Sequence, residues 1–336
     1  MSGQSELTLF RELYDAYFYN ETFKNTRGID ISFLNQHKLL PLLNYVIHQQ
    51  NLYKEVGYKD CELIASYCSH LEKKQSFADK ELDTLAKMMK QEKIHYALRK
   101  GKSLAALYHH PSHRTSNDVD LLVDVTSADD LKSLLAAAGF TCGFYHHQTR
   151  AVHAHKPETL LKYRMSPDHL PHYVKIVDGI PIVIDIAFTL SWTTKQDKIS
   201  TEEILRKATE VNGISFLEPF YNYLHTLLHL YRECVFLTSL QKRPPYLTSV
   251  IDVMLLNRLN SDVDNVDNET HALCELITQL CSALCEGEMD LDSIARQHSF
   301  IEHKGKLIKT NGSFVNLMFT SHKNYKEEFN SITLDR

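Results

Sequence analysis

Hydrophobic positions along the chain change their spacing twice. From residue 5 to about residue 92 they recur at helical spacing, as the N-terminal run LTLFRELYDAYF illustrates. From Lys93 to about residue 195 short β-like runs alternate with helical segments, and residues 200 to 300 return to long helical periodicity. This order predicts an α+β protein in which a small mixed β-sheet core lies between N-terminal and C-terminal helical regions.

These changes of pattern predict four segments. They are an N-terminal helical region over residues 1–92, a mixed-sheet core over 93–199, a C-terminal helical bundle over 200–300 and a tail over 301–336. Within the tail, Asn311-Gly312 lies between two apolar runs and favours a β-hairpin.

Turn and cap residues mark the elements of the core. The run DVDLLVDV predicts a strand, and Ser127 with Asp130 forms a capping-box pattern at the start of a helix that ends at Gly139. Asp178-Gly179 separates the β-like runs YVKIV and IPIVIDIAF, which is a strong hairpin signal. The core is therefore expected to contain a strand, a covering helix and a later hairpin.

Composition excludes several classes of protein. The 336 residues include only 11 glycines and 9 prolines, which favours helix over an all-β fold. Their formal net charge of -5 disfavours a protein that coats nucleic acid, although a local basic cleft is compatible with it. No apolar run approaches the roughly 20 residues of a membrane helix, and the polar N-terminus predicts no secretory leader. Seven cysteines without a C-x-x-C pair favour a reduced, cytoplasmic protein. The lack of a long apolar run predicts no membrane partner.

Two neighbouring carboxylates dominate the predicted strand. Because side chains alternate between faces, Val119, Leu121 and Val123 are expected in a core, and Asp118 and Asp120 lie together on the other face. Like charges this close repel each other unless a divalent cation neutralises them, although a strand with one solvated face would also show the pattern. Mg²⁺ binds through one or two carboxylates plus phosphate oxygens, so the pair suits a nucleoside triphosphate with Mg²⁺.

A third acid lies in an apolar strand. Asp185, within IPIVIDIAF, would be costly as an isolated buried carboxylate. If its strand lies beside the first, Asp185 completes a three-carboxylate site that could hold two metal ions for an in-line phosphoryl or nucleotidyl displacement. Asp185 could also accept the proton of the acceptor.

Small and basic residues around the acidic pair support an anion site. Arg114 lies in a polar loop where its guanidinium could hold phosphate, and Ser116 and Asn117 lead into the strand. Lys100-Gly101-Lys102-Ser103 joins a β-like run to a helix, so backbone N–H groups there could meet an anion. Gly101-Lys102-Ser103 also matches the end of a P-loop motif. That motif requires a glycine five residues before Gly101, where this chain has Tyr96.

Histidines and lysines form the remaining clusters. Nine of the 19 histidines lie between His109 and His172, without the ligand spacing of a zinc site. His169 and His172 are candidates for the acceptor side of the cleft. A basic cluster comprises Lys93, Arg99, Lys100 and Lys102. Phosphate binding by one nucleotide explains this cluster more simply than nucleic acid does.

In order and spacing these motifs resemble the DNA polymerase β-like nucleotidyltransferases, and more closely a family of uncharacterised bacterial nucleotidyltransferases within that superfamily. The resemblance rests on K-G-x-S-L from Lys100, Tyr108, R-x-x-x-D-x-D-L-L-V from Arg114, the helix ending at Gly139-Phe140, H-L-P-H from His169, I-D-I-A-F-T-L-S-W around Asp185, and the later His229 and Asp252. It covers about residues 93 to 260. The chain departs from the usual Gly-Ser or Gly-Gly turn, because Lys102 follows Gly101.

The resemblance implies a function and a role for each motif. Asp118 and Asp120 would bind Mg²⁺, or Mn²⁺, with Asp185 as a third ligand or base. The implied nucleotide-binding residues are Lys100, Gly101, Lys102, Ser103, Arg114, Ser116 and Asn117. The enzyme would move the nucleoside monophosphate of a nucleoside triphosphate, expected to be ATP, to an acceptor and release pyrophosphate. The acceptor could be a small molecule such as an antibiotic or metabolite, a peptide, a protein or RNA.

Two other functions fit the same residues. The carboxylates could bind a nucleotide without turnover, or bind nothing, in a non-catalytic module whose helical flanks contact a protein partner. A phosphotransferase could instead move only the γ-phosphoryl group and leave a nucleoside diphosphate. Pyrophosphate release distinguishes nucleotidyl transfer from both.

Overall fold

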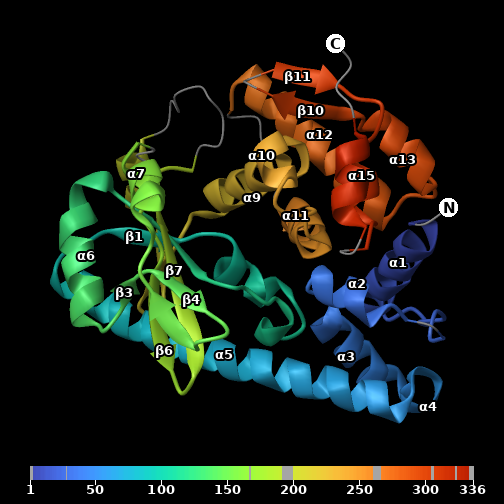
Figure 1. The fold of residues 1–336 in the computed structure, drawn as a ribbon, viewed down its shortest axis with the longest axis horizontal. Helices are drawn as coiled ribbons and strands as arrows, with labels where there is room; N and C mark the ends of the chain where they lie inside the picture. Colours follow the sequence, from blue (N-terminus) through green and yellow to red (C-terminus); the bar gives the residue numbers. More distant parts are fainter. Residues whose placement is uncertain are drawn as a thin grey trace. The chain divides into compact units, whose positions relative to one another are not determined.

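The computed structural model describes residues 3–27, 29–165, 168–190, 200–259, 266–303, 306–321 and 324–332 (Figure 1). These residues form two compact units. The helical unit runs to Cys68 and resumes at Thr226, and the sheet unit comprises the described residues between Ser69 and His225. Helices α5 (Tyr58–Gln91) and α9 (Pro219–Val235) contribute residues to both.

The helical unit is built from short and medium helices at both ends of the chain. They are α1 (Gln4–Tyr19), α2 (Ile31–Gln36), α3 (Leu40–Gln50), α4 (Tyr53–Val56), α10 (Leu237–Leu240), α11 (Leu247–Leu259), α12 (Asn268–Cys285), α13 (Leu291–Gln297), α14 (Phe314–Met318) and α15 (Tyr325–Ser331), with strands β10 (Phe300–His303) and β11 (Lys306–Lys309). Apolar positions at helical spacing bury one face of α1, as the sequence predicts.

The sheet unit contains a mixed seven-stranded sheet in the order β3-β6-β7-β2-β1-β9-β8. Its strands are β1 (Tyr96–Leu98), β2 (Val119–Val123), β3 (Thr141–Cys142), β6 (Tyr173–Val177), β7 (Ile180–Ala187), β8 (Thr209–Val211) and β9 (Ile214–Phe216). Its other elements are the 3₁₀ turns η1 (Gly101–Leu107), η2 (Pro111–His113) and η3 (Val125–Ser127), helices α6 (Ala128–Ala137), α7 (Pro157–Met165) and α8 (Thr201–Arg206), and the separate pair β4 (Phe144–His146) and β5 (Ala151–His153). The pairs β2–β7 and β1–β9 are parallel, and the other pairs of this sheet are antiparallel. The predicted α+β class with a mixed sheet is thereby confirmed.

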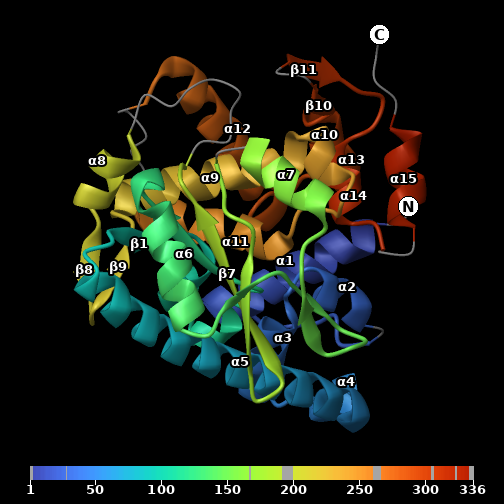
Figure 2. The same ribbon diagram turned by 60° about the vertical axis from the view of Figure 1, so that its left-hand side comes forward.

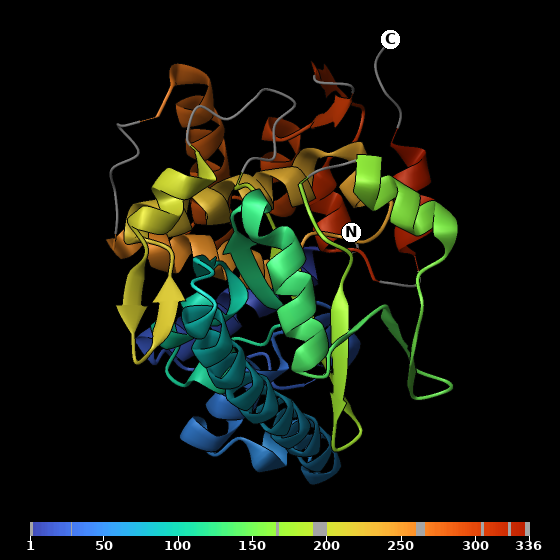
Figure 3. The same cartoon turned by 90° about the vertical axis from the view of Figure 1, so that its left-hand side faces the viewer.

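Helices α5 and α6 cover one face of this sheet (Figures 2 and 3). Val119, Leu121 and Val123 of β2 join the core beneath these helices, as alternation predicts. Leu122 packs on the opposite face against the buried Leu205 of α8. The Asp120 side chain lies on that opposite face, which α5 and α6 do not cover.

The local turn signals of the core are largely realised. Asp178 and Gly179 have φ values of 49° and 76° and connect β6 to β7 as an antiparallel hairpin. Positive φ at both turn residues matches the right-handed twist of paired strands. Gly139, at φ 85°, follows α6 as predicted.

The capping box was predicted wrongly. Ser127 precedes α6 but makes no capping hydrogen bond through its side chain. Asp124 instead accepts from the backbone N–H of Thr126 at 2.8 Å and caps the short η3 turn. The helix predicted after Gly101 is a 3₁₀ turn, η1, rather than an α-helix.

Two other strand predictions need correction. A two-stranded sheet is present in the tail, but β10 and β11 both precede Asn311-Gly312, which leads into α14. The stretch from residue 200 was predicted to be helical, yet β8 and β9 extend the core sheet there. Their turn is Asn212-Gly213, with φ values of 52° and 82°.

The cysteines behave as the composition indicates. All seven are free, and six of them are buried. Cys274, Cys281 and Cys285 lie within α12 and pack in the interior of the helical unit. Within the described ranges, every helix is too short or too polar to cross a membrane.

A buried histidine makes the helical unit sensitive to acid. His37 is fully buried, accepts a hydrogen bond from the backbone N–H of Leu247 at 3.3 Å, and burial lowers its pKa from 6.5 to about 3. Below pH 6.5 the unfolded chain gains a proton that the folded chain does not bind, so stability is lost as the pH falls toward 3. We expect His37→Gln to reduce the pH slope of the unfolding free energy by up to about 1.4 kcal/mol per pH unit in this window. Urea unfolding at pH 7, 6 and 5 measures the slope, and equal slopes for the two proteins would contradict this assignment.

Candidate functional site

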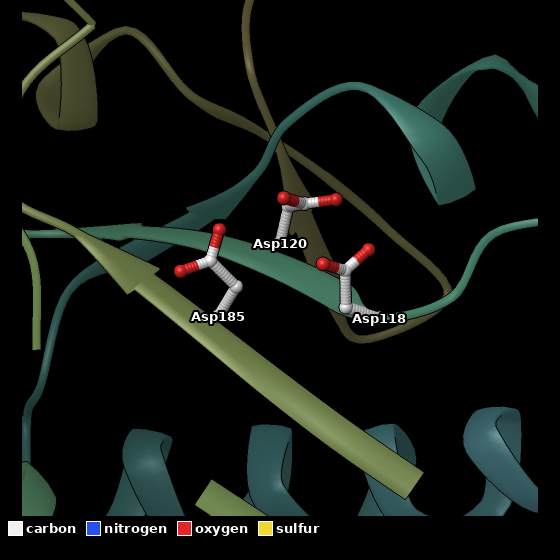
Figure 4. A group of neighbouring side chains, drawn as sticks. All are labelled: Asp118, Asp120 and Asp185. Carbon is white, nitrogen blue, oxygen red and sulfur yellow. The ribbon is translucent and has the colours of Figure 1, made fainter. Parts of the chain in front are cut away.

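Three carboxylates converge on the face of the sheet opposite α5. The parallel register of β2 and β7 places Asp120 directly beside Asp185, and Asp118 lies just before β2 on the same side as Asp120 (Figure 4). One ligand oxygen from each of the three lies within 4.8 Å of the others. Across the described ranges this is the one group of three acidic, histidine or cysteine side chains close enough to share a metal ion. The structure thus brings together all three acids that the sequence singles out.

A buried arginine and a partly buried lysine face these acids. The Arg99 Nη2 atom lies 3.3 Å from Asp185 Oδ2 and 3.9 Å from Asp120 Oδ1, and Lys100 Nζ lies 2.8 Å from Asp120 Oδ1. Arg99 is positioned by strand pairing, because β1 runs antiparallel to β2 and the Arg99 N–H donates to the Asp120 carbonyl at 3.2 Å. The sequence predicts Lys100 as a nucleotide-binding residue but indicates Arg99 only as part of a basic cluster.

The environment separates the pKa values of two acids. Burial, with repulsion from Asp118, raises the pKa of Asp120 above its usual range. Burial also favours a raised pKa for Asp185, but Arg99 and Lys100 outweigh it and lower the pKa. Asp185 is therefore held ionised, while Asp120 gains most from an additional positive charge.

The donor set fits a divalent metal ion. All three candidate ligands are carboxylates, which are the ligands that Mg²⁺ and Mn²⁺ accept. The three carboxylates, with the Arg99 guanidinium and the Lys100 ammonium group, sum to a formal charge of -1. This excess negative charge favours the binding of a further cation. Burial first, and then the neighbouring Asp118, raise the pKa of Asp120, so a cation bound here would favour the ionised form of this carboxyl group.

The turn after β1 approaches the acids closely. Gly101 has φ +33°, and a Cβ atom there would lie 2.9 Å from Ser116 Oγ and 3.5 Å from Asp120 Oδ2. Any larger residue would fill the space beside the acids and would adopt a strained backbone. Ser116 Oγ also donates to Asp118 Oδ1 at 3.2 Å, so this turn and the start of β2 form one surface.

The other predicted nucleotide-binding residues surround this turn in different ways. Lys102 forms an ion pair with Asp79 of α5, and Ser103 Oγ lies 2.8 Å from the Lys100 carbonyl. The Asn117 carbonyl accepts a hydrogen bond from Lys74 Nζ at 3.0 Å. Arg114 is buried, and its Nη1 atom donates to the Thr115 carbonyl at 2.5 Å. These contacts order the turn and the loop before β2.

Histidines approach Asp185 from the other side. His172 Nε2 lies 3.7 Å from Asp185 Oδ1, and His169 pairs through its backbone with Ala187 of β7. Both histidines help to hold the pKa of Asp185 down, after Arg99 and Lys100. The two residues predicted for the acceptor side therefore lie beside the third acid.

Two residues near the site were missed from sequence. Arg99 gives no signal of its own, because only the β1–β2 register shows that it faces the acids. Lys74 lies on α5, within a region whose sequence contains no motif. Helical spacing predicts from sequence that Lys74 and Ala78 share one face of α5, but it does not predict the pocket that both residues line.

Family models, solved structures and curated proteins differ in how far they match this chain. Residues 31–285 match the model of a family described as uncharacterised nucleotidyltransferase. A solved structure of an antigenic nucleotidyltransferase-like protein from Paracoccidioides brasiliensis is similar at 18% identity with a TM-score of 0.33, over 64% of this chain and 96% of that chain. Among curated proteins, no significant match is found.

Proposed function

Because the chain belongs to the uncharacterised nucleotidyltransferase family, we propose that it transfers the nucleoside monophosphate of a nucleoside triphosphate to an acceptor and releases pyrophosphate. The observation that carries this proposal is the convergence of Asp118, Asp120 and Asp185 within 4.8 Å on paired strands. ATP is the expected nucleotide, and the acceptor is a small molecule, a peptide or a protein. The seven free cysteines support a cytoplasmic setting.

Asp118, Asp120 and Asp185 would hold Mg²⁺, or Mn²⁺, as the resident cofactor. When bound, the ion neutralises phosphate charge and stabilises the oxygens that develop charge during displacement. The chain's own contribution is to fix these acids on two hydrogen-bonded strands. Arg99 holds Asp185 ionised at 3.3 Å, so that acid is a ligand at neutral pH.

The surface around Gly101 supports nucleotide binding. Without a side chain at Gly101, the backbone of this turn approaches Ser116 and Asp120 closely, so a phosphate group bound at the acids would lie next to the backbone of the turn. Lys100 and Lys102 supply positive charge there, and we propose that Ser103, Arg114, Ser116 and Asn117 shape the turn and loop that receive the phosphates. Lys100 would exchange its contact with Asp120 for a phosphate oxygen when the metal ion binds.

The acceptor is proposed to enter beside Asp185 and His172. The lowered pKa of Asp185 makes this carboxylate a weak base, which favours a role as a metal ligand. His172 Nε2, 3.7 Å away, is placed to take the proton of an acceptor hydroxyl. In this reaction the acceptor oxygen bonds to the α-phosphorus, and the bond from that phosphorus to the oxygen bridging it to the β-phosphorus breaks. Pyrophosphate leaves with the bridging oxygen, and the acceptor proton passes to His172.

Thermal stabilisation by nucleotides tests the proposal directly. Each of the four common nucleoside triphosphates is added to the wild type with and without Mg²⁺, and a ligand at a hundredfold its dissociation constant should add about 2.7 kcal/mol of stability. We expect a Mg²⁺-dependent shift that disappears in Asp118→Ala and persists in the control Asp129→Ala, whose side chain is exposed on α6. The absence of a shift with every nucleotide would contradict the proposal.

Product analysis separates the remaining functions. Pyrophosphate released with an acceptor supports nucleotidyl transfer. Release of a nucleoside diphosphate would identify γ-phosphoryl transfer. Binding without either product would identify a non-catalytic nucleotide-binding module.

A further inference from the structure

A pocket opens beside Asp118, between α5 and the loop that leads into β2. Its polar lining comprises Lys74 and Gln75 of α5, Lys102, Ser112, and the run from Thr115 to Asp118. Asp118 thus belongs both to this pocket and to the group of three acids. Two ammonium groups and three hydroxyl groups against one carboxylate give the lining a positive balance, which suits an anionic ligand.

Lys74 differs from its neighbouring lysines in its partners. Lys73 is exposed and already paired with Asp178 at 2.6 Å, and Lys102 is paired with Asp79. Lys74 Nζ donates to the Asn117 carbonyl at 3.0 Å, and within the described ranges it has no carboxylate within 4.0 Å. Burial lowers its pKa, and the charge of Asp118 only partly offsets this effect. A cation held in this way is available to bind an anion from solution.

We propose that Lys74 is a phosphate-binding residue and that this pocket receives the two terminal phosphates of the nucleoside triphosphate, which later leave as pyrophosphate. The proposal rests on the proposed nucleotidyl transfer. Mg²⁺ held at Asp118 binds phosphate oxygens as well as carboxylates, so a phosphate chain can extend from the metal ion to Lys74. The histidines lie at Asp185, at the other end of the acidic group, which leaves the Asp118 end for the leaving group.

The assignment gives α5 a part in substrate binding that no motif indicates. Lys74 lies on the helix that otherwise covers the back of the sheet, so one helix supplies both core packing and a ligand contact. The hydrogen bond to the Asn117 carbonyl holds the Lys74 ammonium group close to Asp118, the next residue along the chain. Pre-positioning of this kind limits the side-chain entropy that ligand binding would otherwise cost.

Calorimetric titration with inorganic tripolyphosphate in the presence of Mg²⁺ tests this assignment. We expect Lys74→Met to weaken tripolyphosphate binding tenfold to a hundredfold, where tenfold corresponds to about 1.4 kcal/mol. Lys73→Met is the matched control and should bind like the wild type, because Lys73 points to the exposed Asp178. Lys74→Arg should retain most of the affinity, and Lys74→Gln, which also removes the charge, replaces the methionine variant if that protein does not fold.

Nucleoside monophosphates with Mg²⁺ provide the second arm. They lack the terminal phosphates, so Lys74→Met should bind them as the wild type does. Unchanged tripolyphosphate binding in Lys74→Met, or an equal loss of monophosphate binding, would overturn the assignment. If the wild type binds neither tripolyphosphate nor any nucleoside triphosphate, the proposed function itself fails and the assignment falls with it.

Discussion

Asp120→Asn is expected to lose nucleotidyl transfer by about 10³-fold or more, which corresponds to about 4 kcal/mol of transition-state stabilisation. Asp120 lies at the centre of the acidic group, beside Asp185 in the β2–β7 ladder and 2.8 Å from Lys100 Nζ. The neutral amide removes a metal ligand, and metal ions contribute several kcal/mol to stabilising charge that develops on phosphate oxygens.

The fold should survive this change. Burial and repulsion from Asp118 raise the pKa of Asp120, so the metal-free protein already tolerates a neutral group there. Pyrophosphate release and the far-ultraviolet circular dichroism spectrum are measured on the same preparation. Asp129→Asn on the exposed surface of α6 is the control and should keep full activity. Wild-type pyrophosphate release by Asp120→Asn would sink the assignment of the site.

Arg99→Met is expected to lower the free energy of unfolding by about 3–5 kcal/mol, the typical cost of removing one partner of a buried ion pair. The arginine is fully buried and lies 3.3 Å from Asp185 and 3.9 Å from Asp120. Without it, Asp185 loses its nearest cation, and Lys100 alone is left beside two buried carboxylates. Urea unfolding measures the loss, and Arg206→Met, at the exposed end of α8, should change stability by about 0.5 kcal/mol or less.

Two further measurements separate a charge effect from lost packing. Adding Asp185→Asn to Arg99→Met should recover part of the stability, because the double variant has one fewer unpaired carboxylate. Mg²⁺ should stabilise Arg99→Met more than the wild type, since the ion supplies the missing charge. A loss below about 1 kcal/mol, or no recovery in the double variant, would show that Arg99 does not balance these acids.

The sequence predicted the parts of the site that depend on local pattern. Strand alternation is a local property, so Asp118 and Asp120 could be placed together from the run DVDLLVDV alone. The hairpin at Asp178-Gly179 was also predicted, because its turn residues have a distinctive backbone conformation. Asp185 was tied to the acids only on condition that its strand lay beside theirs, and the β2–β7 pairing meets that condition.

The rest depends on contacts between distant segments. Arg99 lies beside the acids because β1 pairs antiparallel with β2. The register of two strands that are distant in the chain cannot be predicted from one sequence. Lys74 reaches Asn117 from a helix whose periodicity indicates only that one face is buried. Strands β8 and β9 were missed because each has only three residues, too few for alternation to be distinguished from helical spacing.

The sheet order also has a consequence for folding. The antiparallel pair β1–β2 brings Arg99, Lys100, Asp118 and Asp120 together, and these four charges sum to zero. The hairpin β6–β7 brings Asp185 separately, and such local pairs form faster than a parallel pairing between distant strands. The excess negative charge therefore arises only when β2 and β7 join. A divalent cation would bind the completed sheet more tightly than the β1–β2 pair or the β6–β7 hairpin alone. It would therefore stabilise the native strand order late in folding.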